Sequence, residues 1–192
     1  MTEKLEELDR TIFLLVNSAH SPFMDEVMHT LSMRTVWIPV YLLALYFVYR
    51  IYNWKGILAV AAGAGIMIFL SDFGSVHLFK NMFERYRPCN NLLLNGSVHI
   101  YENECSTSFS FISSHASNFF AVATLLTLIF KNHFRFGWIL FFSCAALVAY
   151  SRVYLGLHYP SDVFIGGLYG ILCGLAGFFI FRFVKNKLNS AA

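Results

Sequence analysis

The chain has 192 residues, of which 57% are hydrophobic and only 13% are charged. Soluble domains carry about 25% charged residues, so this composition excludes an ordinary soluble protein and favours a membrane protein. The formal net charge is only +3, and the sequence has no basic stripe with interleaved aromatic residues that would predict nucleic acid as a partner. The length predicts a single domain, residues 1–192.

The first part of the chain, residues 1–33, is predicted to form two short amphipathic helices. The first runs from about Glu3 to Ser18, and the second starts at Ser21-Pro22 and reaches about Leu31. The apolar residues at helical spacing in the first helix are Leu5, Leu8, Ile12, Leu15 and Val16. Amphipathic helices suit the surface of a bilayer. Packing of the same helices on a helical bundle is an equally good and compatible interpretation.

Five longer apolar segments follow, at about 35–51, 56–79, 114–130, 136–151 and 162–183. They are apolar all round and not along one stripe, which is typical of membrane-spanning helices. Gly170 and Gly174 have the GxxxG spacing of closely packed transmembrane helices. The sequence therefore predicts an all-α, polytopic membrane helical bundle over residues 35–183, with about five transmembrane helices.

Three polar motifs, at 80–88, 113–115 and 151–162, lie at the ends of these apolar segments. With five membrane passes they fall on one side of the membrane, which we call the motif face. Each side carries seven Lys and Arg residues, but three on the motif face belong to the predicted site, which leaves four there. The positive-inside rule then predicts that the motif face lies outside the cytoplasm.

The last motif, Ser151 to Asp162, predicts a histidine–carboxylate pair at the start of a helix. Gly156 supplies a turn after one helix, and Pro160 suits the first turn of the next. Asp162 can then accept a hydrogen bond from one ring nitrogen of His158, which leaves the other nitrogen free to attack phosphorus. Taken alone, a simple helix-capping role for both residues is an equally good alternative.

The middle motif, Phe111 to His115, predicts an anion-binding helix start. Ser113 is a good N-cap, and the backbone N–H groups that follow it lack partners within the helix. His115 falls in the first turn, where it can protonate a departing alcohol as a general acid. For a lone histidine, hydrogen bonding to interfacial water is the simpler alternative.

The first motif, Lys80 to Pro88, supplies cations at a membrane edge. Lys80 gives a point charge, and Arg87 gives a planar fork that can bind two phosphate oxygens. Pro88 disfavours helical geometry at Arg87 and turns that side chain away from the preceding helix. In isolation, such a run is typical of basic residues that snorkel to the interface.

The order of the three motifs favours catalysis over these separate alternatives. Lys-x6-Arg-Pro, then Ser-x-His, then Ser-Arg-x5-His-x3-Asp resembles the type 2 phosphatidic acid phosphatase superfamily, which consists of integral-membrane, metal-independent lipid phosphate phosphatases. The resemblance covers roughly residues 80–162. It implies phosphate binding by Lys80, Arg87, Ser113, Ser114 and Arg152. It also implies that His158 is the nucleophile, that His115 is the general acid and that Asp162 orients His158.

Three residues stand out against the pattern of that superfamily. Ile112 and Ser114 replace the proline and the glycine that are usual in the second motif, so we expect a modified phosphate cradle and not an inactive site. Arg85 matches an additional arginine of many bacterial members.

The predicted activity is dephosphorylation of a membrane lipid phosphate or diphosphate through a phosphohistidine, without a metal ion or another cofactor. The resemblance offers lipid A, undecaprenyl diphosphate, phosphatidylglycerol phosphate and phosphatidic acid as substrates. The first two are favoured because both present phosphate at the outer leaflet. We expect the protein in a bacterial inner membrane, with the site on the periplasmic face and with the bilayer and its phosphorylated lipids as partners. Phosphotransfer to an alcohol and a non-catalytic lipid-binding protein are the alternatives.

The four cysteines and Asp72 have predicted structural roles. The sequence leaves open whether two of the cysteines pair, and it does not identify the partner of Asp72. Cys89 and Cys105 flank the polar loop after the first motif, and they either form a disulfide or remain two separate thiols. Cys144 and Cys173 lie in apolar segments and are predicted core residues. Asp72, inside an apolar segment, is expected to face the bundle or a polar cavity in a structural hydrogen-bonding role.

Overall fold

The structure, a computed structural model, describes residues 3–94, 96–103 and 105–190. Within these ranges the chain is helical and forms no β-strand, in agreement with the predicted all-α class. The longer helices are α1 (Glu3–Asn17), α2 (Pro22–Ser32), α3 (Ile38–Gly74), α5 (Ser114–Phe130), α6 (Gly137–Tyr154) and α7 (Pro160–Ser190). The shorter elements are η1 (Arg34–Trp37), the π-helical η2 (Ser75–Lys80), α4 (Asn81–Phe83), η3 (Pro88–Asn90), η4 (Leu92–Leu94) and η5 (Tyr101–Asn103).

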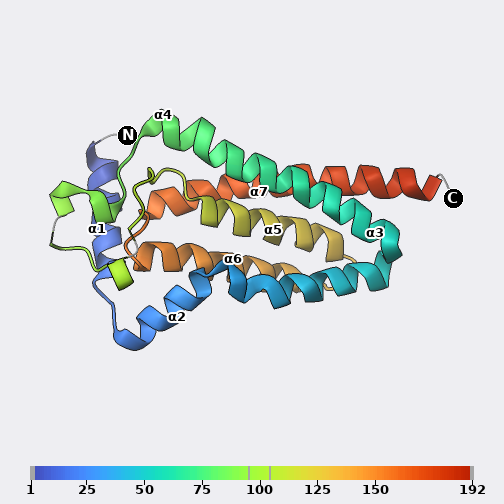
Figure 1. Cartoon of the computed structure of the whole chain (residues 1–192), viewed down its shortest axis with the longest axis horizontal. Helices are drawn as coiled ribbons and strands as arrows, with labels where there is room; N and C mark the ends of the chain where they lie inside the picture. The colour runs from blue at the N-terminus through green and yellow to red at the C-terminus, as the bar shows by residue number, and fades with distance from the viewer. Residues whose placement is uncertain (1–2, 95, 104, 191–192) are drawn as a thin grey trace.

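The two predicted spans at 35–51 and 56–79 form one helix, α3, that doubles back at Asn53. Asn53 has a φ of 57° and a ψ of −161°, and asparagine adopts a positive φ more often than most residues do. Figure 1 shows the two arms of α3 meeting at one end of the bundle and spreading apart toward the other. The second arm continues through η2 and ends in the first motif, at Lys80.

Helix α5 lies at the centre of the bundle, where it contacts α7, α6 and α3. Small residues let α7 approach α5 closely. A Cβ added to Gly174 would lie 2.5 Å from the backbone oxygen of Ala121, and one added to Gly170 would collide with the backbone of Ser117. The predicted GxxxG contact is therefore confirmed, and its partner is α5.

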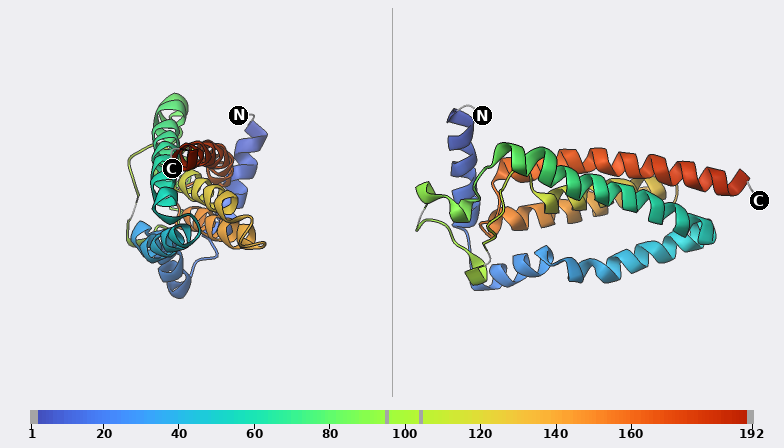
Figure 2. Two further views of the ribbon diagram at one scale, coloured as in Figure 1. Left: turned by 90° about the vertical axis from the view of Figure 1, so that its right-hand side faces the viewer. Right: turned by 45° about the horizontal axis from the view of Figure 1, so that its top comes forward.

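The outside of the bundle is apolar along its length. Examples of large apolar side chains that are 56% to 65% exposed are Leu43, Phe69, Leu172 and Phe183. The helical stretches that are long and apolar enough to cross a membrane are 34–94, 137–154 and 160–190, with α5 as a shorter apolar helix. Because α3 doubles back, the bundle contains the five lengthwise segments predicted for a polytopic membrane protein (Figure 2).

Helix α1 lies across one end of the bundle, at a steep angle to the long helices (Figures 1 and 2). The residues that it buries against the bundle are Asp9, Phe13 and Asn17. The ring of Phe13 packs edge-on against Tyr159, with 5.5 Å between the ring centroids. Four other large apolar side chains of α1 stay 40% to 72% exposed, and the first three of them line a cavity between α1, α4 and α7: Leu5, Leu8, Ile12 and Leu15. Helix α1 therefore packs on the bundle and also presents an apolar face outward, as a helix at a membrane surface would.

The polar loop between α4 and α5 lies at the same end of the bundle. Cys89 and Cys105 form a disulfide across this loop, which resolves the alternative of two separate thiols. Cys144 and Cys173 are free thiols on α6 and α7, as their apolar surroundings predicted. This end of the molecule is the motif face.

Candidate active site on the motif face

The three motifs meet on the motif face around a cavity of about 460 Å³, which we call the catalytic cavity after the role predicted for it. The cavity is lined by Arg34, Lys80, Arg87, Cys105, Ser106, Ser114, His115, Arg152, Leu157 and His158. Both histidines of the predicted site therefore face one space, together with all three of the predicted cations. A tetrahedral anion in this space would meet positive charge from several directions.

The tautomer of His158 is defined by its neighbours. Arg87 Nη1, which can only donate, lies 3.3 Å from His158 Nε2, so Nε2 is an acceptor and carries the lone pair. On the other side of the ring, Ser110 Oγ lies 3.3 Å from Nδ1 and donates a hydrogen bond to Asp162 Oδ2. Neutral His158 therefore carries its proton on Nδ1 and presents Nε2 beside Arg87, at the catalytic cavity.

Asp162 contacts His158 largely through Ser110. The direct separation between His158 Nδ1 and Asp162 Oδ2 is 3.5 Å, which is longer than a strong hydrogen bond. Asp162 Oδ2 also accepts the backbone N–H of Tyr159 at 2.9 Å, which holds the carboxylate against the histidine loop. The predicted histidine–carboxylate pair is thus close in space, and Ser110 is a third member that the motif spacing did not reveal.

Burial controls the charge of His158, which lies in the loop between α6 and α7 and is 1% exposed. Burial lowers the pKa of this imidazole well below its ordinary value, and the Arg87 guanidinium adds to the effect while Asp162 opposes it. The ring is therefore neutral at pH 7. Neutral imidazole is the form that can attack phosphorus.

The predicted effect of Pro88 on Arg87 is confirmed, since Arg87 has an extended backbone with φ −68° and ψ 154°. The guanidinium donates to the backbone oxygen of Ser108 at 2.8 Å, to Ser108 Oγ at 3.0 Å and to the backbone oxygen of Leu157 at 3.1 Å. Arg87 therefore joins the polar loop to the histidine loop. All three nitrogens of the guanidinium already have partners, and the phosphate-binding role of Arg87 stays a prediction.

The N-cap predicted in the second motif is confirmed, since the Ser113 side chain accepts a backbone N–H from the first turn of α5. The Ser113 N–H in turn donates to the backbone oxygen of Asp162 at 3.0 Å, which joins the second motif to the third. Helix α7 comes close at Gly166, where an added Cβ would lie 2.7 Å from the backbone oxygen of Ser113. These contacts keep the start of α5, with His115, next to the third motif.

Polar side chains join α5 to the second arm of α3 and to η2. The hydrogen-bonded pairs, at 2.6 to 2.8 Å, are Ser71–Ser117, Asp72–Asn118 and Ser75–Ser114. Asp72 thus has the structural role that we expected, and Asn118 is its partner. The pairs also fix the position of the element that carries Lys80.

A fourth cation, Arg34, lines the catalytic cavity. It belongs to η1, directly before the first arm of α3, so the N-terminal part of the chain contributes to the site. Arg152 makes a related connection, since its Nη1 donates to Ser32 Oγ at the end of α2. No sequence pattern pointed to Arg34, because a basic residue just outside a membrane span is ordinary.

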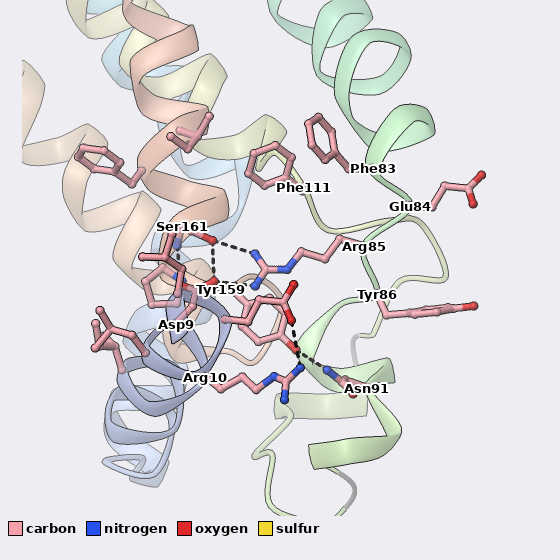
Figure 3. A pocket seen from close by; sticks show the side chains of 17 residues that line it. Asp9, Arg10, Phe83, Glu84, Arg85, Tyr86, Asn91, Phe111, Tyr159 and Ser161 are labelled. Carbon is pink, nitrogen blue, oxygen red and sulfur yellow. Dashed lines mark hydrogen bonds and ion pairs between the residues drawn. The ribbon is translucent and has the colours of Figure 1, made fainter. Parts of the chain in front are cut away.

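Arg85 lies behind Asp162, in a larger cavity of about 1020 Å³ between α1, α4 and α7 (Figure 3). Its Nη1 donates to Asp162 Oδ1 at 2.7 Å, and its Nη2 donates to Asp9 Oδ2 at 2.6 Å. Ser161 strengthens this connection, because its backbone N–H and its hydroxyl both donate to Asp9. The guanidinium also lies 4.0 Å from the ring centroid of Tyr159. Buried charges therefore link α1 to the carboxylate beside His158, and Asp9 is a residue that motif spacing missed.

A third cavity, of about 390 Å³, lies between the two arms of α3 and α5 and adjoins the catalytic cavity; we call it the apolar cavity. Arg34 and His115 line both the catalytic cavity and the apolar cavity. The apolar residues that line the apolar cavity are Tyr41, Ala44, Leu45, Val48, Val60, Ala64, Met67, Ile68, Phe119, Val122, Leu125 and Leu126. The hydrogen-bonded pair Asp72–Asn118 also lines it, so this cavity is largely but not wholly apolar.

Comparison with known proteins agrees with this architecture. Residues 54–187 match the sequence profile of the PAP2 superfamily. The lipid A 4′-phosphatase of Bacteroides thetaiotaomicron is 30% identical to the chain over 191 residues, which covers 99% of this chain and 82% of the relative.

Two solved structures share the fold. A transmembrane PAP2 type phosphatidylglycerolphosphate phosphatase from Bacillus subtilis has a TM-score of 0.65 at 26% identity, over 97% of this chain and 88% of that one. Aquifex aeolicus LpxE has a TM-score of 0.61 at 26% identity, over 88% of this chain and 94% of that one. The predicted enzyme class, a phosphoric ester hydrolase, is confirmed by the named relatives. Because the profile covers more than half of the chain and the Bacteroides relative aligns with nearly all of it, the chain belongs to the PAP2 superfamily, as its three motifs predicted.

Proposed function

We propose that the protein is a metal-independent phosphatase of membrane lipid phosphates, with His158 as its nucleophile. The observation that carries the proposal is the one cavity that both imidazoles and four cationic side chains line. Displacement at phosphorus needs an attacking group, a proton donor for the leaving oxygen and positive charge around the phosphoryl oxygens. The residues that line the cavity supply all three.

In the first half-reaction, His158 Nε2 attacks phosphorus and forms a P–N bond. The P–O bond to the lipid breaks on the opposite side, and its electron pair passes to the lipid oxygen. His115 donates its proton to that oxygen, so the lipid leaves as an alcohol. The chain from Nδ1–H through Ser110 to Asp162 stabilises the positive charge that the imidazole gains.

In the second half-reaction, water attacks the phosphohistidine while His115, now neutral, accepts a proton from that water. The P–N bond breaks, its electron pair returns to His158 and inorganic phosphate leaves. In both steps Lys80, Arg87 and Arg152 stabilise the phosphoryl oxygens, together with Ser113, Ser114 and the backbone N–H groups at the start of α5.

The apolar cavity supports a lipid as the leaving group. The oxygen that departs must lie close to His115, and His115 lines both cavities. Hydrocarbon attached to that oxygen would then extend between the arms of α3. We place lipid A-type phosphates first, because the lipid A 4′-phosphatase matches 99% of this chain at 30% identity, and the other predicted lipids second.

Two observations support a site on the periplasmic face of a bacterial inner membrane. The disulfide between Cys89 and Cys105 lies on the motif face, and disulfides persist in oxidising compartments. When the three predicted site cations are discounted, seven Lys and Arg residues on the opposite face against four on the motif face favour the same orientation. Residues 1–192 would then act as one catalytic domain, in which 1–33 lies at the membrane surface.

The test is release of inorganic phosphate by the purified chain, in mixed micelles, from lipid A, undecaprenyl diphosphate, phosphatidylglycerol phosphate and phosphatidic acid. We expect release from lipid A with excess EDTA present, and a loss of at least roughly 1,000-fold in kcat for His158→Ala. The matched control is His133→Ala, which removes an exposed imidazole from the opposite end of the bundle and should leave the rate unchanged. Equal rates for His158→Ala and the native chain, or release from none of the four lipids, would overturn the proposal.

A further inference from the structure

A second cluster of histidine and carboxylate side chains lies on the motif face, outside the catalytic cavity. His20 comes from the turn between α1 and α2, Asp25 from α2, and His99 from the polar loop. One donor atom from each of the three residues lies within 4.8 Å of the other two. We propose that these residues form a structural binding site for a divalent transition-metal ion, with Zn²⁺ as the best match.

The distances suit a tetrahedral site after a small movement. Zinc bonds of about 2.0–2.1 Å place neighbouring ligand atoms roughly 3.3 Å apart. His99 Nε2 and Asp25 Oδ2 are already 3.0 Å apart. The His20 side chain is exposed, so rotation about its own bonds is enough to bring its ring nitrogen to the same point.

The charge of Asp25 favours a cation at this place. Its carboxylate is 6% exposed, and within the described residues its side-chain partners are the hydroxyl of Tyr154 and the ring of His99. A buried carboxylate without a lysine or arginine partner is costly. A divalent cation bound to Oδ2 would offset that cost.

The stacking of the two histidines shows which side chain must move for both to bind one ion. The rings of His20 and His99 are stacked with centroids 3.7 Å apart and planes 7° apart. The lone pair of an imidazole nitrogen lies in the plane of its ring, so two stacked rings cannot both direct a nitrogen at one ion. The exposed ring of His20 therefore has to turn out of the stack, while His99 stays beside Asp25.

The groups around the three ligands hold two of them in position. Tyr154 donates from its hydroxyl to Asp25 Oδ1 at 2.8 Å, which leaves Oδ2 directed at the histidines. Asn17 fixes the backbone of His99 from both sides, because it accepts from the His99 N–H at 2.8 Å and donates to the His99 oxygen at 2.9 Å. Partners of this kind orient the ligands in many metal sites.

Two nitrogen ligands and one oxygen ligand suit Zn²⁺ better than Mg²⁺ or Ca²⁺, which prefer oxygen ligands alone. A fourth position stays open to water. The ligands come from α2, from the turn before it and from the polar loop that also supplies Cys105 and Ser106 to the catalytic cavity. Bound metal would therefore fix this loop to the N-terminal helices, and its effect would be on stability and not on the chemical step.

The experiment measures zinc bound to the full-length, tag-free chain in detergent micelles, by equilibrium dialysis after treatment with EDTA. We expect one Zn²⁺ per chain and a rise in Tm when ZnCl₂ is added back. His20→Ala should weaken zinc binding at least roughly tenfold and abolish the rise in Tm, while the protein still folds because His20 is exposed. The matched control is His77→Ala, which removes another exposed histidine, from η2, and should bind zinc as the native chain does.

X-ray absorption at the zinc edge gives a second measurement that does not depend on the variants. It should show nitrogen and oxygen ligands at about 2.0–2.1 Å, including two imidazoles. Absence of bound zinc in the native chain would overturn the proposal, and so would equal zinc binding by His20→Ala. Phosphate release in EDTA at low temperature should continue, so failure of the zinc site leaves the proposed catalytic function intact.

Discussion

At the residue scale, His158 lies between two neighbours with opposite hydrogen-bonding abilities. Arg87 offers only N–H donors to Nε2, whereas the hydroxyl of Ser110 can accept from Nδ1 while it donates to Asp162. Together these neighbours select one tautomer of a neutral, buried ring. Asp162 acts on this ring both directly, across 3.5 Å, and through the hydroxyl of Ser110.

We expect Ser110→Ala to lower kcat by roughly 10- to 100-fold with little change in KM, because a buried hydrogen bond to a charged group contributes about 1.5–3 kcal/mol. The measurement is steady-state phosphate release from the preferred lipid. Thr107→Ala, an exposed change in the same loop, serves as the control and should retain the native kcat. A native kcat for Ser110→Ala would show that Asp162 acts on His158 without the serine.

The residues of the site differ in how well the sequence could predict them. His158 and Asp162 are four residues apart across a predicted helix start, so local spacing was enough to pair them. Arg34 and Asp9 lie far from all three motifs in the chain, and Ser110, although it directly precedes the middle motif, lies 48 residues before His158, so these contacts leave no spacing pattern. Their proximity to the site is a result of how the helices and the polar loop pack together.

At the scale of elements, α1 is part of the support for Asp162, the carboxylate beside His158. Its outward face is apolar, while its inward face carries the buried Asp9 that holds Arg85 against Asp162. A sequence pattern alone predicts the amphipathic helix and its apolar side. It does not predict that one acidic residue on the other side pairs with an arginine 76 positions later.

We expect Asp9→Asn to lower kcat by roughly tenfold or more and to lower Tm, because it leaves the Arg85 charge without one of its two carboxylates. A purely structural role would lower Tm alone, so kcat at a temperature where both proteins stay folded is the decisive measurement. Glu7→Gln is the control, since Glu7 is exposed on the same helix and does not line the cavity around Arg85. Recovery of kcat in Asp9→Glu would support a role for the charge, and a native kcat in Asp9→Asn would exclude it.

The helices begin and end close to the predicted residues where polar residues interrupt the apolar segments. Helix α5 spans Ser114–Phe130, the limits expected from the apolar segment and its serine cap. The bend at Asn53 falls in the short polar gap between the first two apolar segments. The π-helical turn η2 was not predictable, because its sequence continues the apolar pattern of α3.

At the scale of the whole molecule, the orientation in the membrane decides which leaflet supplies the substrate. We expect Ser97→Cys, in the polar loop, to react with a membrane-impermeant maleimide in intact spheroplasts. Asn132→Cys, in the exposed turn between α5 and α6, should react only after the membrane is opened. The native chain is the control, because its two free thiols lie on α6 and α7. The opposite labelling pattern would place the motif face in the cytoplasm.

The doubled-back shape of α3 determines which measure of substrate concentration should control the velocity of the enzyme. The arms of α3 frame a largely apolar hollow that His115 also lines, and under the proposed function the lipid enters and leaves through this hollow. A substrate that arrives along this route diffuses in two dimensions. The velocity of the enzyme should therefore follow the mole fraction of phosphorylated lipid within the micelle or leaflet, and dilution with unreactive lipid should slow it even when the amount of substrate per millilitre is constant.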